Sequence, residues 1–473
     1  MIERVKIEKG SCMMQGITVK ELTEALGGRL LCGEEMTEIK TLSFDSRQIK
    51  EKTLYVPLPG EHVDGHQFIS SAFQNKAAAT LTTKGEIVEV EKPHIQVEDC
   101  KRALQLAGAY FRKKKAIPIV GITGSVGKTT TRSLVAEALS AKKTVFQTKG
   151  NLNSQIGVPV MLSEIAEEEM AVLEMGISEF GEMERLTNIV HPDLAVITCI
   201  GVAHIRQLES QENICKEKMK IALGMEENRI LLLNGDDPLL RAGRNSVKNV
   251  VLLYGTTPDC DFYAKEIRIV EGKAVFRAVC LEEEVEVTLS MPGMHNVLNA
   301  MAALAVCKLY QVPLKQAAKR LEQFSGVSMR QQVIITKKYT IIDDTYNANP
   351  DSMKAGIRVL MELPKEGRKI AVLGDMLELG EEEQKYHQEI GRFAADIGVD
   401  LLLTVGNLTR DMEEAALREG KGIQVKHFQD NKQIAAYLKE LLLPEDVVLL
   451  KGSRGMALDQ VVKELCIFAE YSN

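Results

Sequence analysis

One stretch of the chain, GITGSVGKTTT at residues 121–131, constrains the fold more than any other. An apolar run at residues 117–120 precedes it, and a helical pattern at residues 134–139 follows it. A glycine-rich turn between a strand and a helix points backbone N–H groups at an anion beside the helix N-terminus. The stretch therefore predicts a phosphate-binding loop on an α/β sheet, with Lys128 on the β- and γ-phosphates and the Thr129 hydroxyl on Mg²⁺.

The spacing of this loop is irregular. In the usual G-x-x-x-x-G-K-[ST] motif the first glycine would stand at position 122, which is Ile122 here. An ordinary glycine-rich turn is the alternative, but Gly-Lys-Thr-Thr between a strand and a helix favours the phosphate-binding interpretation. The residues expected to contact the nucleotide are Gly124, Ser125, Val126, Gly127, Lys128, Thr129 and Thr130.

Composition limits the classes of protein to consider. The chain has 473 residues, and at roughly 150 residues per domain about three domains are expected. The net charge is −7 and the basic residues are scattered, so we expect no nucleic-acid partner. The basic run at residues 112–115 is interpreted as a linker. Nine widely spaced cysteines and the lack of a long apolar stretch predict a cytoplasmic protein with reduced thiols and no membrane span.

The order of strand and helix patterns predicts an α/β fold with three domains. Residues 1–112 hold short β-like runs before an Ala/Leu-rich helix, which predicts a small α/β domain. Residues 113–326 alternate apolar strands with helical patterns, which is typical of parallel β-α-β units around the phosphate loop. After a linker at residues 326–330, the alternation resumes, so residues 327–473 are expected to form a Rossmann-like domain.

Several acidic residues follow predicted strands. Glu174 ends the apolar run at residues 171–173, where an acid beside a phosphate loop reaches Mg²⁺; a helix-capping acid is the alternative. Ligands of open α/β sheets lie at the carboxyl ends of the strands. We therefore expect Glu174, Asp343, Asp344 and Asp375 to face a common cleft.

Three further features are ambiguous when taken alone. The run DDTYNANP at residues 343–350 is either a binding loop or an Asx-rich connection. Asn296 and Asn299 share one face of a helix and either contact an adenine edge or cap that helix. His204 and Lys218 would, in isolation, most simply be a structural histidine and a solvated lysine.

Taken together and in this order, the motifs resemble the Mur ligases of bacterial cell-wall synthesis over nearly the whole chain. The irregular phosphate loop is the form typical of that family, and YNANPDSM and LGDMLELG look like the member that adds D-alanyl-D-alanine. Besides the loop, the matching runs are FDSRQIKEKTLYVPLPGEHVDGHQFI (44–69), GNLNSQIGVP (150–159), EMGISEFGEM (174–183), AHIRQLESQENICKEK (203–218), GMHNVLNAMAALAV (293–306), DDTYNANPDSM (343–353), LGDMLELG (373–380) and KGSRGM (451–456).

The resemblance implies amide-bond formation through an acyl phosphate. ATP would phosphorylate the terminal carboxylate of a UDP-N-acetylmuramoyl-tripeptide, and the amine of D-alanyl-D-alanine would displace the phosphate. The products would be UDP-N-acetylmuramoyl-pentapeptide, ADP and phosphate. Two Mg²⁺ ions are implied, small molecules are the expected partners, and a monomer is expected.

The resemblance also implies roles for individual residues. The catalytic residues would be Lys128, His204 and Lys218, and the metal ligands Thr129, Glu174, His204 and Lys218. Lys218 would be an N6-carboxylysine, with Lys216 two residues away as the alternative. Asn296 and Asn299 would lie near the adenine, and Arg330 would reach ATP from the third domain when the domains close.

The remaining implied sites concern the two other substrates. The UDP-sugar would be bound by Ser46, Arg47, His62 and Asn153. The dipeptide would be bound by Asn347, Asn349, Lys451 and Ser453.

Two other classes of protein compete with this interpretation. A folylpolyglutamate-synthase-like ligase would share the loop but would not need the DSR and DGH motifs near the N-terminus. A nucleotide-dependent switch would need a guanine-binding N-K-x-D motif, whereas Asn431-Lys432-Gln433 is followed by Ile434. The third residue of the tripeptide, lysine or a diamino acid such as meso-diaminopimelate, is left open.

Overall fold

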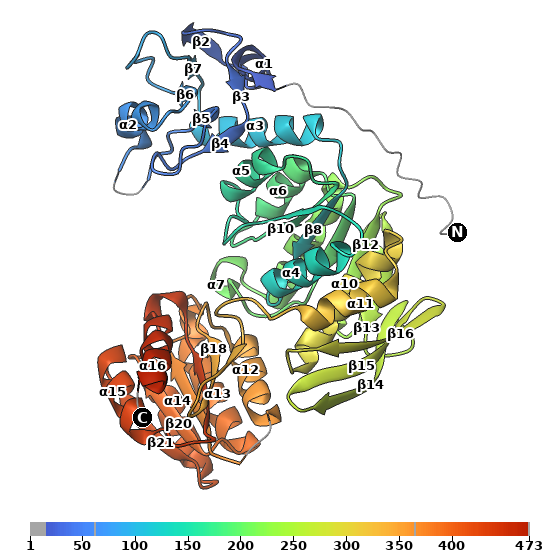
Figure 1. Cartoon of the computed structure of the whole chain (residues 1–473), viewed down its shortest axis with the longest axis vertical. Helices are drawn as coiled ribbons and strands as arrows, with labels where there is room; N and C mark the ends of the chain where they lie inside the picture. The colour runs from blue at the N-terminus through green and yellow to red at the C-terminus, as the bar shows by residue number, and fades with distance from the viewer. Residues whose placement is uncertain (1–15, 61–62, 364–365, 472–473) are drawn as a thin grey trace.

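The computed structural model describes residues 16–60, 63–363 and 366–471, which form three units along the long axis of the molecule (Figure 1). The N-terminal unit lies at one end, the central unit carries the phosphate loop, and the C-terminal unit lies at the other end. Each unit contains a β-sheet with helices packed against it, so the expected α/β class with three units is confirmed. The exact domain boundaries stay predictions.

The N-terminal unit is built on a five-stranded sheet in the order β2-β7-β6-β5-β4, beside a two-stranded β1-β3 pair. The short β-like runs expected in this part of the chain are present as strands, and the Ala/Leu-rich helix is present as the last helix of the unit. The strands are β1 (Ile17–Thr18), β2 (Arg29–Cys32), β3 (Glu38–Ile39), β4 (Thr41–Ser43), β5 (Thr53–Tyr55), β6 (Ala79–Thr82) and β7 (His94–Gln96). The helices are α1 (Val19–Ala25), α2 (Ile69–Gln74) and α3 (Cys100–Lys114).

The basic run at residues 112–115 is not a linker, as the sequence suggested, but the end of helix α3 and its junction with the central unit. Arg112 donates hydrogen bonds to the carbonyls of Val190 (2.8 Å), Lys115 (2.9 Å) and Ile117 (3.0 Å), and it forms an ion pair with Asp193 (3.0 Å). Basic residues in the last turn also suit the negative end of the helix dipole. A run of like charge therefore marked a helix end.

The central unit contains a nine-stranded sheet in the order β16-β15-β14-β13-β12-β11-β8-β10-β9. The strands from β8 to β13 pair in parallel, as the alternating pattern predicts. They are β8 (Ile119–Thr123), β9 (Val145–Gln147), β10 (Met170–Glu174), β11 (Leu194–Ile197), β12 (Ile230–Asn234) and β13 (Val250–Gly255).

The central sheet is not parallel throughout, because at one end it continues beyond the predicted parallel units. There β14 (Phe262–Val270), β15 (Lys273–Cys280) and β16 (Glu283–Leu289) form an antiparallel extension, seen beside the C-terminal unit in Figure 1. Glu271 and Gly272 join β14 to β15 with φ of 51° and 75°. Two positive φ values suit the tight turns of β-hairpins, which need no intervening helix.

Helices cover both faces of the central sheet. Alternate residues of one strand face opposite sides, so Ile119 packs with α3, α5 and α6 while Val120 packs with α4, α10 and α11. The helices are α4 (Lys128–Leu139), α5 (Gly157–Glu164), α6 (Glu182–Val190), α7 (Ile205–Leu208), α8 (Gln211–Met219), α9 (Pro238–Gly243), α10 (Met294–Leu309) and α11 (Leu314–Gln323).

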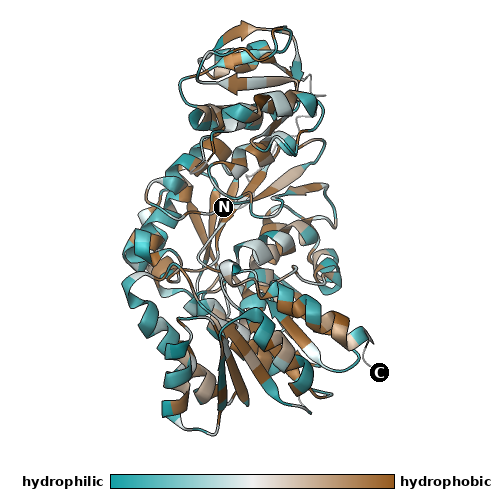
Figure 2. Ribbon diagram, turned by 90° about the vertical axis from the view of Figure 1, so that its left-hand side faces the viewer, coloured by the Kyte–Doolittle hydropathy of each residue, from teal (hydrophilic) through white to brown (hydrophobic). Residues whose placement is uncertain are grey.

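The C-terminal unit is a six-stranded sheet in the order β17-β18-β22-β19-β20-β21, parallel except for β17 at one edge. Apolar strands lie between layers of helices whose outer faces are polar (Figure 2). The strands are β17 (Gln332–Ile335), β18 (Thr340–Asp344), β19 (Lys369–Gly374), β20 (Leu401–Val405), β21 (Gln424–Phe428) and β22 (Val447–Lys451). The helices are α12 (Pro350–Glu362), α13 (Glu383–Ile397), α14 (Arg410–Glu419), α15 (Asn431–Leu441) and α16 (Asp459–Tyr471).

Among the described residues, no helix is both long and apolar enough to cross a membrane.

Replacing Arg112 with alanine is expected to destabilise the junction between α3 and the central sheet. The change removes hydrogen bonds to four carbonyls, the fourth being that of His191 at 3.3 Å, and one partner of a largely buried ion pair. The expected cost is about 2–4 kcal/mol. Thermal unfolding would show a lower midpoint. Lys113→Ala, in the next and exposed position, is the matched control and should stay within about 0.5 kcal/mol of the parent. Equal midpoints for the two variants would contradict the junction role of Arg112.

Candidate active site

The phosphate loop joins the end of β8 to the first turn of α4. Gly124 and Gly127 have φ of 150° and 85°, which side chains disfavour. A Cβ at Gly127 would also stand 2.9 Å from Oδ1 of Asn299. The ammonium of Lys128 folds back onto the loop and donates to the Gly124 carbonyl at 2.9 Å. Backbone N–H groups at the start of α4 are therefore left facing a space in which an anion can bind.

Glu174 lies beside this loop because β10 is the parallel neighbour of β8. The last residues of both strands meet at one edge, where Glu174 is opposite Ile122. The Thr129 hydroxyl donates to Oε2 of Glu174 at 2.9 Å, and the Asn153 amide donates to Oε1 at 2.8 Å. Glu174 is 2% exposed and belongs to a strand, so the helix-capping alternative is wrong.

Arg330 reaches the same hydroxyl from the segment that leads into the C-terminal unit. Its guanidinium donates to Oγ1 of Thr129 at 3.2 Å and lies 4.0 Å from the centre of the Tyr346 ring. Tyr346 lies within the polar run at residues 343–350 but was not among the predicted site residues. Thr129 thus connects a helix, a strand and the C-terminal unit at one atom.

The charges around Thr129 do not balance. Lys128 and Arg132 each interact electrostatically with Glu174 and with Arg330, which makes three cations in the neighbourhood of one carboxylate. Burial lowers the pKa of Lys128, with Glu174 acting in the opposite direction. The surplus of positive charge would be neutralised by a polyphosphate.

His204 and Lys218 lie on the other side of the loop. His204 precedes α7, and its Nδ1 stands 3.7 Å from Oε2 of Glu378 in the C-terminal unit. Lys218 is 2% exposed on α8, while Lys216 is exposed, so only Lys218 of the two faces inward. Burial, and secondarily Lys128, lower the pKa of Lys218 to about 7. Lys218 is therefore not a solvated lysine.

Electrostatic coupling shows that these residues are neighbours. Burial lowers the pKa of His204, and the charges of Lys128 and Lys218 lower it further. Within the described residues, the Lys218 ammonium has no ion pair or hydrogen bond. Lys128, His204 and Lys218, predicted as catalytic, are thus brought together.

Asn296 and Asn299 are buried in the first turns of α10, behind the phosphate loop. Asn296 donates to the Pro292 carbonyl at 2.7 Å, and Asn299 accepts from the Thr131 hydroxyl at 2.9 Å. Neither side chain caps α10, so that alternative is wrong. In this structure the pair supports the loop from the α10 side; contact with adenine stays a prediction.

The predicted dipeptide residues gather at the carboxyl ends of β18 and β22. Lys451 forms a buried ion pair with Asp344 at 2.8 Å and donates to the Asn347 carbonyl at 2.9 Å. Asn349 caps α12. The Ser453 hydroxyl accepts from the Leu377 N–H at 2.9 Å. Each therefore has a structural contact, and their contact with a dipeptide is untested.

Two acids near this cluster have other partners. Asp375 accepts hydrogen bonds from three backbone N–H groups, those of Asn407, Leu408 and Thr409. Asp351, which sequence analysis did not single out, accepts from the Val202 N–H of the central unit at 3.4 Å. Asp375 thus stabilises the loop before α14, whereas Asp351 links two units.

The predicted UDP-sugar residues do not all lie together. Arg47 is exposed and paired with Asp45 at 2.9 Å, and the Ser46 carbonyl accepts from Asn75 at 2.8 Å. His62 lies outside the described residues. Asn153 is in the central unit, where its amide donates to Glu174, whereas Ser46 and Arg47 are in the N-terminal unit. Contact of these residues with a UDP-sugar stays a prediction.

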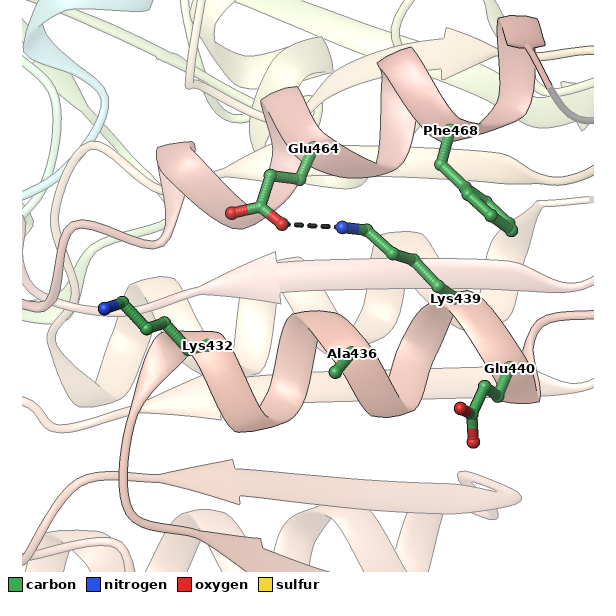
Figure 3. Close-up of a pocket in the computed structure, with 6 residues that line it drawn as sticks. All are labelled: Lys432, Ala436, Lys439, Glu440, Glu464 and Phe468. Carbon is green, nitrogen blue, oxygen red and sulfur yellow. Dashed lines mark hydrogen bonds and ion pairs between the residues drawn. The ribbon is translucent and has the colours of Figure 1, made fainter.

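A separate pocket of about 420 Å³ lies between α15 and α16 (Figure 3). Lys439 crosses it to pair with Glu464 at 2.7 Å, beside Phe468. None of the predicted site residues lines it. Its mixture of paired charges and one aromatic ring indicates a groove between two surface helices.

The donors present fit Mg²⁺ bound to a nucleotide. Mg²⁺ usually takes one or two protein oxygens and completes its shell with phosphates and water. Thr129 and Glu174 supply two oxygens at the loop. No cluster of three or more His, Cys, Asp or Glu able to hold a metal occurs in the part of the chain that the structure describes. A metal here would therefore depend on the phosphates of the nucleotide.

Comparison with family models identifies the class of protein that this fold and site define. Residues 38–112 match the catalytic domain of the Mur ligase family, residues 122–307 the Mur ligase middle domain, and residues 329–454 the glutamate ligase domain of Mur ligases. The chain belongs to the Mur ligase family.

Individual relatives cover nearly the whole chain. The UDP-N-acetylmuramoyl-tripeptide–D-alanyl-D-alanine ligase of Bacillus subtilis is 36% identical over 95% of this chain and 98% of its own length. The crystal structure of MurF from Acinetobacter baumannii superposes with a TM-score of 0.86, at 30% identity, over 96% and 99% of the two chains. MurF ligase from Thermotoga maritima, solved in complex with ADP, has a TM-score of 0.81 at 29% identity, over 91% and 98%.

The buried Lys218 is expected to make stability depend on pH. Its pKa is near 7 when folded and 10.4 when unfolded, so between these values the unfolded chain binds the extra proton. Stability of the parent protein should rise with pH across this window relative to Lys218→Met, by at most about 1.4 kcal/mol per pH unit. Thermal unfolding at pH 7 and 9.5 in CO₂-free buffer measures this.

Lys216→Met is the control, because it removes an exposed side chain. The stability of this variant should depend on pH in the same way as that of the parent protein. If the unfolding midpoints of Lys218→Met and the parent differ by the same amount at both pH values, the lowered pKa of Lys218 is contradicted.

Proposed function

We propose that this chain is an ATP-dependent ligase that joins D-alanyl-D-alanine to UDP-N-acetylmuramoyl-tripeptide in the cytoplasm. The products are UDP-N-acetylmuramoyl-pentapeptide, ADP and phosphate, as peptidoglycan precursor synthesis requires. The observation that carries the proposal is the hydrogen-bonded set of Thr129, Glu174 and Arg330 at a phosphate loop. The D-alanyl-D-alanine ligases matched along nearly the full chain support the choice of substrates.

The charge distribution suits attack of a carboxylate on a phosphate. Both reactants are anionic, so they approach only where cations offset the repulsion. Lys128 and Arg330 supply fixed positive charge beside the loop N–H groups, and Lys128 moves from the Gly124 carbonyl onto the phosphates when ATP binds. The substrate carboxylate then attacks the γ-phosphorus, the bond to the β–γ bridging oxygen breaks, and ADP leaves.

Thr129 and Glu174 are proposed to hold one Mg²⁺, and His204 with a carboxylated Lys218 a second. Bound there, Mg²⁺ supplies positive charge to the phosphate and acyl oxygens. Carboxylation joins a neutral Lys218 amine to CO₂, releases one proton, and replaces a cation that would repel the metal with an anionic ligand. The lowered pKa and the unpaired, buried position of Lys218 support this chemistry.

The C-terminal unit is proposed to bring the dipeptide to the acyl phosphate. Its amine attacks the acyl carbon, phosphate leaves, and the amine loses a proton. Arg330, Asp351 and Glu378 already contact the central unit, which supports closure of residues 327–473 over residues 113–326. The proposed dipeptide contacts are Asn347, Asn349, Lys451 and Ser453.

The N-terminal unit, residues 1–112, is proposed to bind the UDP-sugar through Ser46, Arg47 and His62. Asn153 donates to Glu174, so it would contact the substrate near its reacting end. Adenine is proposed to lie near Asn296 and Asn299.

Phosphate release should require both ATP with Mg²⁺ and D-alanyl-D-alanine when UDP-N-acetylmuramoyl-tripeptide is present. Glu174→Gln removes the anionic oxygen beside Thr129 and should lower kcat/KM by about 100-fold. Glu184→Gln, on the exposed side of α6, is the control and should be unaffected. Release that proceeds equally without the dipeptide would show a hydrolase or a switch instead of a ligase.

Carboxylation of Lys218 has a direct spectroscopic test. Protein equilibrated with ¹³C-bicarbonate should show a carbamate carbon resonance that is lost in Lys218→Met and kept in Lys216→Met. Lys218 is the buried amine and the one with the lowered pKa, so its neutral form is available to react with CO₂ at neutral pH. A resonance that disappears only in Lys216→Met would assign the modification to the other lysine.

A further inference from the structure

Arg132 is a buried arginine to which the proposed mechanism assigns no role. It follows Thr129 by one turn of α4, so both side chains lie on the same side of that helix. Arg132 is 7% exposed, and among the described residues it has no ion pair. A buried guanidinium without a carboxylate partner is costly, which points to a specific role for the contacts that it does make.

Those contacts lead to Glu174 through a single residue. The Arg132 guanidinium donates to the Thr148 carbonyl and, at 3.2 Å, to the Ser133 hydroxyl. Thr148 is buried directly after β9, and its hydroxyl accepts from the backbone N–H of Glu174 at 2.9 Å. Thr148 therefore has its carbonyl fixed by Arg132 while its side chain fixes the backbone of Glu174.

Glu174 is thus held at three points. Thr129 donates to one carboxylate oxygen, Asn153 donates to the other, and Thr148 accepts from the backbone. The first two contacts would be exchanged or shared when a metal binds, because they occupy the carboxylate oxygens themselves. The contact with Thr148 uses the backbone N–H of Glu174 and not its carboxylate oxygens. We therefore expect this contact to remain both with and without a bound metal.

Charge adds to this geometry. Burial lowers the pKa of Arg132, and Glu174 is the acid whose field acts against that change. Arg132 therefore acts on Glu174 through Thr148 and through its own charge, and it is buried with its donors on Thr148 and Ser133.

We infer that Arg132 is a positioning residue for Glu174: through the Thr148 carbonyl and hydroxyl it holds the carboxylate in the orientation that a nucleotide-bound divalent cation requires. The inference rests on the proposed function, in which Glu174 is a metal ligand. Residues that orient metal ligands typically change metal affinity by about 10- to 100-fold when they are replaced.

The test measures Mn²⁺ binding to the complex of the full-length protein with ADP, by electron paramagnetic resonance. Arg132→Gln should weaken Mn²⁺ binding by about 10-fold or more. Arg132→Lys, which keeps a charged donor, should recover most of the affinity. Metal-free ADP binding, measured by calorimetry in EDTA, should change much less than Mn²⁺ binding in Arg132→Gln. A purely structural role would shift the unfolding midpoint without moving the Mn²⁺ affinity.

Thr148 supplies the matched pair of variants. Thr148→Val removes the hydroxyl and should weaken Mn²⁺ binding, whereas Thr148→Ser should not. The double variant Arg132→Gln/Thr148→Val should lose little more than either single one, because both act through one contact chain. If Arg132→Gln does not fold, the Thr148 pair still decides: unchanged Mn²⁺ affinity in Thr148→Val overturns the inference.

Two outcomes separate this inference from the proposed function. Equal losses of metal-free ADP and Mn²⁺ binding in Arg132→Gln would overturn the positioning role and leave the metal site intact. Unchanged Mn²⁺ affinity in Glu174→Gln would overturn the metal site itself, and the inference with it.

Discussion

The hydroxyl of Thr129 is the point on which the arrangement of the site depends. It donates to Glu174 and accepts from Arg330, so one oxygen joins α4, β10 and the segment entering the C-terminal unit. A hydroxyl has one proton to donate and two lone pairs to accept with, which permits both contacts at once. Glu174 reaches it only if β10 is the neighbour of β8, and Arg330 only if the C-terminal unit packs at the carboxyl edge of that sheet. The two hydrogen bonds of this one oxygen therefore require both the strand order and the placement of the third unit.

The same region carries more positive charge than its own acids can neutralise. Lys128 and Arg132 interact electrostatically both with Glu174 and with Arg330, and Lys128 also lowers the pKa values of His204 and Lys218. Mutual repulsion of buried cations is unfavourable in the free protein, and a bound polyphosphate would relieve it. Part of the affinity for nucleotide thus arises from repulsion that binding removes. Neutralising Lys128 with phosphates would also weaken its effect on Lys218, which links nucleotide binding to the protonation of that amine.

Much of the fold and part of the site followed from local sequence patterns. Apolar strands before helical segments gave the parallel order, and the phosphate loop with Glu174 lay where strand ends meet. The hairpin turn at Glu271 and Gly272 was missed because a strand followed by another strand has no signature in the alternation of strands and helices. The role of Arg112 was missed because a run of basic residues has the same sequence whether its side chains are solvated or packed against another unit. Here Arg112 contacts Val190 and Asp193 of the central unit. The contacts of Arg132 with Thr148 and of Tyr346 with Arg330 depend on how the chain packs in three dimensions, which one sequence does not reveal.

The two junctions between units differ in a way that bears on movement. The N-terminal unit is joined to the central one by buried contacts: the Leu42 N–H donates to Ser163 at 2.9 Å, and Gly108 packs so closely on Pro159 that a Cβ would stand 2.6 Å away. The C-terminal unit touches the central one through polar side-chain contacts: Gln331 with His295 at 2.5 Å, Arg330 with Thr129 at 3.2 Å and Asp351 with Val202 at 3.4 Å. Separating the first junction would expose core residues, whereas separating the second exchanges polar contacts for water. Movement of the C-terminal unit is therefore the less costly of the two, which supports the proposed closure that would bring Arg330 onto the nucleotide.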